Sequence, residues 1–279
     1  MTEVYTAGAF SKDGAGGNKA GVVLECGGLT AAEKIRIARE LGYSETAFVS
    51  HCETADFALE YFTPAGEVPM CGHATIGTFT VLESAGMLDK REYRIQTKSG
   101  ELSILIDSDG LIYMEQNAPQ FFDVLTASDI GDCFGAAELN ERLPIQIVST
   151  GLRDIMLPVS DAGALLALKP DFEKIAALSR AKNCVGIHAF APADGEITAV
   201  CRNFAPLYDI NEEAATGTSN CALACYLYKY GVKRDEYVFE QGRPLGSVSE
   251  IRARLEIQDG AIRRVFVGGH GYAVGKTTV

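Results

Sequence analysis

Three side chains that can exchange protons stand beside apolar segments in the first third of the chain. Cys71 and His73 lie near the start of residues 68–82, a stretch without Asp, Glu, Lys or Arg. Glu45 directly precedes the largely apolar residues 46–49. A thiol, an imidazole and a carboxylate next to buried structure are the groups that enzymes use as general acids and bases. These residues therefore favour proton-transfer chemistry, although each alone could also be a buried thiol, a half-buried imidazole or an exposed loop carboxylate.

A second stretch without charged residues, 214–228, begins with Thr216, Gly217 and Thr218. A helix without a charged face is most simply buried on nearly all sides. The start of such a helix offers unpaired N–H groups and the positive end of its dipole, and glycine there lets a ligand approach the backbone. We expect Gly72 and Gly217 to give two such starts, which together could hold a small carboxylate. For either helix alone, simple capping is the better explanation.

The two stretches belong to a longer repeated pattern. Each follows a Phe-x-Pro segment, at 62–64 and 204–206. A glycine also follows each at the same distance, because Gly86 lies 15 positions after Cys71 and Gly231 lies 15 positions after Thr216. Several such matches in the same order indicate an internal duplication. We predict an N-terminal half, 1–120, and a C-terminal half, 121–279, and the last strand could return to the N-terminal half.

The local patterns predict the elements of each half. Thr30 and Glu33 form a capping box before a helix that Gly42 can end. Asp109-Gly110 and Asp259-Gly260 lie between alternating apolar runs, which is typical of hairpins. We expect an α+β fold of two pseudo-symmetric domains, each a mostly antiparallel strand layer or barrel around a central buried helix. A simple two-layer sandwich fits nearly as well.

Composition excludes several classes of function. The 279 residues carry 25 Lys and Arg against 37 Asp and Glu, a formal charge of -12, so nucleic acid and anionic membranes are poor partners. No apolar run reaches the roughly 20 residues of a membrane span, and residues 1–24 lack a signal-peptide pattern. The eight Cys form no CxxC pair, so we expect reduced thiols, a cytoplasmic location and no metal site.

The sequence resembles the PhzF-like phenazine-biosynthesis family along essentially its whole length. The motifs that carry the resemblance, in chain order, are GGNKAGVVL at 16–24, SETAF at 44–48, FTP at 62–64, CGHAT at 71–75, EEAATGT at 212–218, QG at 241–242 followed by Gly246, and VGG at 267–269. The resemblance implies a diaminopimelate-epimerase-like fold with its site in the cleft between two similar domains. It also implies a cofactor-independent isomerase, commonly a homodimer.

Site residues carry over from the family motif by motif. The family resemblance makes Glu45 the residue that moves a proton along a dihydro-hydroxyanthranilate ring, with His73 as the motif histidine. It places an assisting acid at Glu213 and a hydroxyl at Thr218, where the family usually has Asp and Ser. Asn18 lies in the GNKA motif, in which Lys19 replaces the usual proline, and we assign it to substrate binding. These departures leave the proton-transfer groups in place and leave the substrate open.

We therefore predict an isomerase of a small carboxylate that needs no cofactor. Glu45, His73 and Glu213 are the predicted catalytic residues, and the predicted substrate-binding residues are Cys71, Gly72, Thr216, Gly217, Thr218 and Asn18. An amino-acid racemase, an epimerase or a hydroxyproline-type dehydratase with Cys71 as the base is one alternative. A two-thiol racemase is disfavoured because the position equivalent to Cys71 is Thr216. The other alternative is a non-catalytic protein that binds a metabolite.

Overall fold

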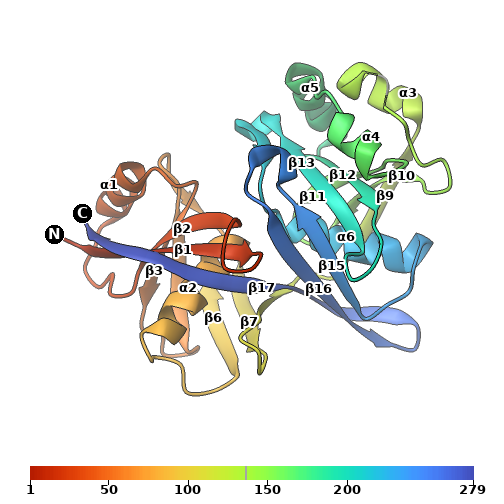
Figure 1. Cartoon of the computed structure of the whole chain (residues 1–279). Helices are drawn as coiled ribbons and strands as arrows, with labels where there is room; N and C mark the ends of the chain where they lie inside the picture. Colours follow the sequence, from red (N-terminus) through yellow and green to blue (C-terminus); the bar gives the residue numbers. More distant parts are fainter. Residues whose placement is uncertain (136) are drawn as a thin grey trace. The chain divides into compact units, whose positions relative to one another are not determined.

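The chain divides into two compact units (Figure 1). The computed structural model describes residues 1–135 and 137–279. The first unit contains Met1–Glu115 and Gly268–Val279, and the second contains Gln116–Val267. The second unit begins at Gln116, whereas the sequence analysis placed the boundary after residue 120. The last strand, β17 (Ala261–Thr278), starts in the second unit and ends in the first.

The strands of the first unit form a closed ring. Its elements before β17 are β1 (Glu3–Ser11), β2 (Asn18–Val23), α1 (Ala31–Leu41), β3 (Thr46–Ser50), β4 (Phe57–Phe62), β5 (Glu67–Val68), α2 (Gly72–Ser84), β6 (Glu92–Thr97), β7 (Gly100–Ile106) and β8 (Ile112–Gln116). From β1 the pairing runs through β2, β3, β4, β6, β7 and β8. Strand β17 pairs with both β8 and β1, which closes the barrel.

Helix α2 is buried and packs against β1, β2 and β3. A Cβ placed on Gly77 would lie only 3.4 Å from the Cβ of Ala7 and 4.0 Å from that of Ala20, so small residues allow the helix to approach the strands. Phe79 and Leu82 are fully buried, and burying one such side chain stabilises the fold by about 1.5–3 kcal/mol. The absence of charge from 68–82 therefore reflects a helix that strands surround.

The second unit repeats this topology. Its elements are β9 (Gln120–Leu125), α3 (Ala127–Ile130), η1 (Gly131–Phe134), β10 (Ile145–Ser149), β11 (Arg153–Pro158), α4 (Ala162–Ala167), α5 (Phe172–Lys182), β12 (Gly186–Pro192), β13 (Ala199–Ala205), η2 (Pro206–Tyr208), β14 (Ile210–Glu213), α6 (Gly217–Tyr230), β15 (Glu236–Gln241), η3 (Arg243–Leu245) and β16 (Ser249–Gln258). Buried α6 packs against β10, β11 and β16. A core that includes Leu157, Leu165, Ile175 and Ile187 lies between the strands and helices α4 and α5.

Strand pairing makes the duplication visible. In the first unit the pairs β1–β2, β2–β3, β3–β4, β4–β6 and β6–β7 are antiparallel, parallel, antiparallel, parallel and antiparallel. In the second unit the pairs β10–β11, β11–β12, β12–β13, β13–β15 and β15–β16 show the same order. Strand β9 pairs antiparallel with β10, as β17 does with β1. The first unit thus takes its closing strand from the far end of the chain.

Local patterns formed as expected. Thr30 caps α1 and accepts from the backbone N–H of Glu33, whose carboxylate accepts from Thr30, and Gly42 ends the helix at a φ of 71°. The turn with Asp109-Gly110 joins β7 to β8, in which Ile106 faces Ile112. No helix in the described residues is long and apolar enough to cross a membrane.

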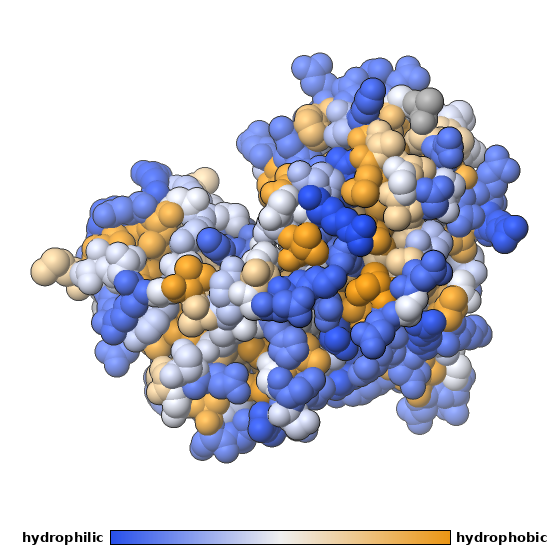
Figure 2. Space-filling model, in the orientation of Figure 1, coloured by the Kyte–Doolittle hydropathy of each residue, from blue (hydrophilic) through white to orange (hydrophobic). Residues whose placement is uncertain are grey.

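Exposed apolar residues are distributed over the surface. On the face shown in Figure 2, hydrophilic residues predominate and apolar residues form separate patches. The large exposed apolar side chains come from different parts of the chain, among them Val124, Leu152, Tyr208 and Val232. Such isolated exposure is normal on a folded chain.

Candidate active site

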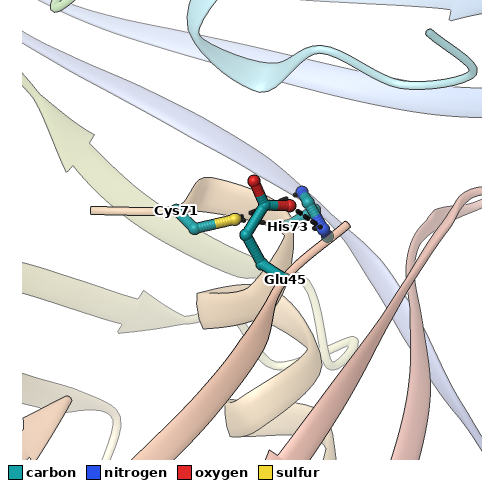
Figure 3. Close-up of side chains that lie close together, drawn as sticks. All are labelled: Glu45, Cys71 and His73. Carbon is teal, nitrogen blue, oxygen red and sulfur yellow. Dashed lines mark hydrogen bonds and ion pairs between the residues drawn. The ribbon is translucent and has the colours of Figure 1, made fainter. Parts of the chain in front are cut away.

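Glu45, Cys71 and His73 lie together in the first unit (Figure 3). Glu45 directly precedes β3, Cys71 is the N-cap residue of α2, and His73 lies in the first turn of that helix. His73 Nε2 is 3.3 Å from Glu45 Oε2, and His73 Nδ1 is 3.3 Å from Cys71 Sγ. The imidazole therefore contacts both a carboxylate and a thiol.

His73 is held as a neutral ring. Its side chain is 7% exposed, and burial lowers its pKa while the nearby Glu45 carboxylate raises it. A proton on Nε2 would be donated to Glu45, which leaves Nδ1 to accept from the thiol of Cys71. Ser44, which the sequence analysis did not single out, places its Oγ 3.4 Å from Nε2. The imidazole therefore has a thiol, a carboxylate and a hydroxyl within hydrogen-bond reach.

Buried hydroxyls hold the start of α2. Thr75 donates to the carbonyl of Cys71 at 2.7 Å, and the Tyr61 hydroxyl lies 2.6 Å from Thr75 Oγ1. Because the proton of Thr75 points to the carbonyl, Tyr61 is the donor in the second bond. Burial raises the pKa of Tyr61 well above its ordinary value, so this donor stays protonated. Thr75 belongs to the CGHAT motif, whereas Tyr61 carried no signal in the sequence.

The same three residues offer one donor atom each within 4.8 Å of one another, as a metal site would. Cys71 Sγ lies 3.3 Å from His73 Nδ1 and 3.9 Å from Nε2, and Glu45 Oε2 lies 3.3 Å from Nε2, so the thiol and the carboxylate both face the same part of the ring. The three groups can exchange protons through hydrogen bonds. The expectation that the protein has no metal site stays a prediction.

In the second unit, Glu213, Thr216 and Thr218 gather at the start of α6. Thr216 is the N-cap residue, but its side chain does not cap the helix; it donates instead to Glu213 Oε2 at 2.7 Å. Thr218 donates to Gln116 Oε1 at 3.2 Å. Cys71 likewise makes no side-chain capping bond at α2. Simple capping therefore does not explain the residue types at either helix start.

Glu212, the neighbour of Glu213, has a structural role. Its carboxylate makes a bidentate ion pair with Arg202 of β13, with N–O distances of 2.9 and 2.8 Å. The third guanidinium nitrogen, Nη1, donates to the carbonyls of Leu165 and Leu168 at the end of α4. Both charged side chains are at most 9% exposed. The ion pair therefore ties β13, β14 and α4 together.

The structure thus brings the candidate residues into two groups. Glu45, Cys71 and His73 contact one another around Gly72, the first residue of α2. Glu213, Thr216 and Thr218 surround Gly217, the first residue of α6. Asn18 opens β2, opposite Ala9 of β1, and its substrate contact stays a prediction. The convergence of the two groups on one substrate also stays a prediction.

A buried polar chain runs behind the start of α6. Ser219 donates to Asp154 Oδ2 at 2.5 Å, and Asn203 donates to Ser219 Oγ at 3.3 Å and to His188 Nδ1 at 3.2 Å. Burial raises the pKa of Asp154 to about 6, against the hydrogen bond from Ser219. Burial lowers the pKa of His188 to about 4, against a hydrogen bond with Asn220. Burial therefore shifts the pKa values of the two groups in opposite directions, in each case towards the neutral form.

We expect Asp154→Asn to stabilise the protein at neutral pH and not at pH 4. Burial disfavours the ionised form of Asp154 in the folded state. The stability that protonated Asp154 contributes is therefore fully present below its ordinary pKa of 3.8 and is lost as pH rises through its folded-state pKa of about 6. This pKa shift corresponds to a loss of up to about 3 kcal/mol in the free energy of unfolding at pH 7.5. Urea unfolding at a series of pH values measures it as the difference from wild type.

His188→Asn is the matched control with the opposite sign. Neutral His188 contributes stability above its ordinary pKa of 6.5, which is lost as pH falls towards about 4. The gain from His188→Asn relative to wild type should therefore grow as pH falls. Differences that do not change with pH in either variant would show that these groups do not titrate as described.

Comparisons with known proteins agree with this architecture. The family described as phenazine biosynthesis-like protein matches residues 7–277. An uncharacterized isomerase of Deinococcus radiodurans is 34% identical, with 96% of this chain and 92% of that protein covered. The trans-2,3-dihydro-3-hydroxyanthranilate isomerase of Pseudomonas chlororaphis is 28% identical over 97% of this chain and 96% of that protein.

A solved structure carries the same fold. The Bacillus anthracis phenazine biosynthesis protein of the PhzF family superposes with a TM-score of 0.91 at 30% identity, covering 100% of this chain and 98% of that one. This likeness confirms the predicted α+β class, and the names of the relatives confirm the predicted enzyme class, an isomerase. The chain belongs to the phenazine biosynthesis-like (PhzF) protein family.

Proposed function

We propose that this isomerase shifts a proton within a small carboxylate, with Glu45 as the general acid and base. The contact between Glu45 and His73 is the observation that carries the proposal. Glu45 is 20% exposed, whereas His73 is 7% exposed, so the carboxylate is the more accessible of the two. Glu45 would remove a proton from one carbon and return it to another, while His73 holds the carboxylate in place through Nε2.

The second part of the proposal concerns the substrate. The N–H groups at the starts of α2 and α6 would bind the substrate carboxylate, and Glu213 would position it or relay a proton. The internal duplication supports this pairing, because it gives each unit an equivalent helix start. We place the site in the cleft between the two halves. A proton shift within one molecule changes no oxidation state, so we propose that the reaction needs no cofactor.

The substrate class is proposed from the chemistry and from a relative. A proton on the carbon next to a carbon–carbon double bond or an imine is acidic enough for a carboxylate base in a site that excludes water. The Pseudomonas chlororaphis relative is named for trans-2,3-dihydro-3-hydroxyanthranilate. We propose that compound and smaller unsaturated or amino acids as the substrates to be examined.

A solvent-exchange experiment tests the proposal. Each candidate acid is incubated with the protein in deuterium oxide and followed by proton NMR. A proton on a carboxyl that bound substrate shields from water exchanges slowly, so the product should retain part of the original hydrogen at its new carbon. Complete deuteration with inversion at one carbon would contradict the single-carboxylate shift. Saturable binding without any turnover would favour the non-catalytic alternative.

One observation favours a second candidate function. Cys71 Sγ lies 3.3 Å from His73 Nδ1, which can accept its proton and leave a thiolate base. Such a base would suit an epimerase or a dehydratase of amino acids. Thr216 in place of a second thiol favours dehydration over racemisation, because no thiol acid would return a proton from the opposite face.

The assembly and location stay predictions. The family resemblance implies a homodimer, and the sequence predicts a cytoplasmic protein that binds neither nucleic acid nor membrane. Sedimentation velocity at micromolar concentration measures the oligomeric state directly. A stable monomer would remove the dimer without affecting the chemistry.

A further inference from the structure

Gln241 ends strand β15 and is completely buried. Its side-chain nitrogen donates to the backbone carbonyl of Glu213 at 2.7 Å and to Thr216 Oγ1 at 3.0 Å. Its side-chain oxygen accepts from Asn220 at 2.8 Å. A carbonyl oxygen can only accept, so the amide orientation is determined by its partners. Gln241 therefore contacts the segment before α6 and the helix itself.

This orientation determines the direction of the next hydrogen bond. Thr216 Oγ1 accepts from Gln241 and has one proton of its own to donate. Glu213 Oε2 lies 2.7 Å away and accepts that proton. The chain runs one way, from the amide of Gln241 through the hydroxyl of Thr216 to the carboxylate of Glu213. A hydroxyl that donates to a carboxylate favours its ionised form.

The loop after β15 is held against the same segment. Ser249 donates to the carbonyl of Ala214 at 2.8 Å. Gly242 has a φ of 89°, and a Cβ there would lie 2.1 Å from the carbonyl oxygen of Ser247 and 2.8 Å from that of Ala214. Only glycine allows this approach. The segment that carries Glu213 is thus held on one side by β15 and the loop that follows it.

We propose that Gln241 is a positioning residue that keeps Glu213 ionised and oriented by forcing the Thr216 hydroxyl to donate to it. Gln241 does not touch the Glu213 carboxylate and acts through Thr216. The proposal depends on the proposed function only for the catalytic role of Glu213. Its test is a titration that needs no substrate, so the failure of one does not imply the failure of the other.

Carbon NMR of protein labelled at the glutamate side-chain carboxyl measures the ionisation of Glu213. The resonance is assigned by its loss in Glu213→Gln. Thr216→Val keeps the shape and removes the donor, so the ionisation midpoint of Glu213 should move up by about one pH unit. Thr216→Ser keeps the hydroxyl and should restore the wild-type midpoint. Thr218→Val, whose hydroxyl donates to Gln116 instead, is the matched control and should leave the midpoint unchanged.

A double-mutant cycle tests the role of Gln241. Gln241→Met should also raise the midpoint, because the Thr216 hydroxyl is then free to rotate away. If Gln241 acts through Thr216, the double variant Gln241→Met, Thr216→Val should show no larger shift than Thr216→Val alone. Circular dichroism confirms that each variant is folded.

Three outcomes would overturn the proposal. The first is an unchanged midpoint in folded Thr216→Val. The second is a shift in Thr216→Val that Thr216→Ser does not reverse. The third is an additive shift in the double variant, which would mean that Gln241 acts on Glu213 by another route. If no Gln241→Met protein folds, Gln241→Asn, which shortens the amide by one methylene, replaces it in the cycle with the same expected result.

Discussion

Glu45→Gln should lower the turnover of the substrate identified in the exchange experiment by about 10²- to 10⁴-fold. The amide has the shape of the carboxylate, and its oxygen can still accept a hydrogen bond from His73 Nε2, which lies 3.3 Å from Glu45 Oε2 in the wild type. It cannot accept the proton of the substrate. Steady-state kinetics should show the loss in kcat with little change in KM, since the bound geometry is retained.

Cys71→Ser is the matched comparison for that loss. Serine retains a hydroxyl near His73 Nδ1, so a role in binding or orientation survives while the basic thiolate is removed. We expect it to cost far less than Glu45→Gln. An inactive Cys71→Ser together with an active Glu45→Gln would assign the reaction to the thiol and favour the epimerase or dehydratase.

Glu212→Gln should lower the free energy of unfolding by about 3–5 kcal/mol, because it leaves the guanidinium of Arg202 buried without its counter-charge. In the folded protein, both side chains are at most 9% exposed and the pair is bidentate. The carbonyls of Leu165 and Leu168 satisfy one nitrogen but carry no net charge. Urea unfolding followed by circular dichroism measures the change.

Glu213→Gln is the control for this prediction because it lies one position along the chain and faces Thr216 instead. It should affect catalysis and change stability by much less. The double variant Arg202→Met, Glu212→Gln should recover much of the loss, because replacing a buried ion pair by uncharged side chains is often neutral. A loss below about 1 kcal/mol in Glu212→Gln would mean that the ion pair contributes no more than a surface pair does.

Sequence alone predicts features that local chemistry decides. The capping box of Thr30 and Glu33 and the starts of α2 and α6 depend on a few neighbouring residues, so their patterns are specific. Charge-free helices must be buried, and the strands around them follow from that need. These features account for the correct fold class.

The contacts of the site depend on residues far apart in sequence. The pairing of Glu45 with His73 spans the three strands β3, β4 and β5, so no local pattern predicts it, and the family resemblance assigned both residues to one site. Glu212 and Glu213 are adjacent and chemically identical. Glu212 nevertheless forms an ion pair with Arg202 on the neighbouring strand, whereas Glu213 accepts a hydrogen bond from Thr216. Gln241 shows the same limit, since its partners at Glu213 and Thr216 lie more than twenty positions away.

The route of β17 has a consequence for synthesis on the ribosome. The whole second unit has been synthesised by Val267, but the first unit lacks its closing strand until Gly268–Val279 has been added. Until then the edges of β1 and β8 that pair with β17 are open, and open edges are templates for pairing with other chains. Domains usually complete their folding in the order of their synthesis, the N-terminal one first. Here the barrel that holds Glu45 and His73 is begun first and closed last.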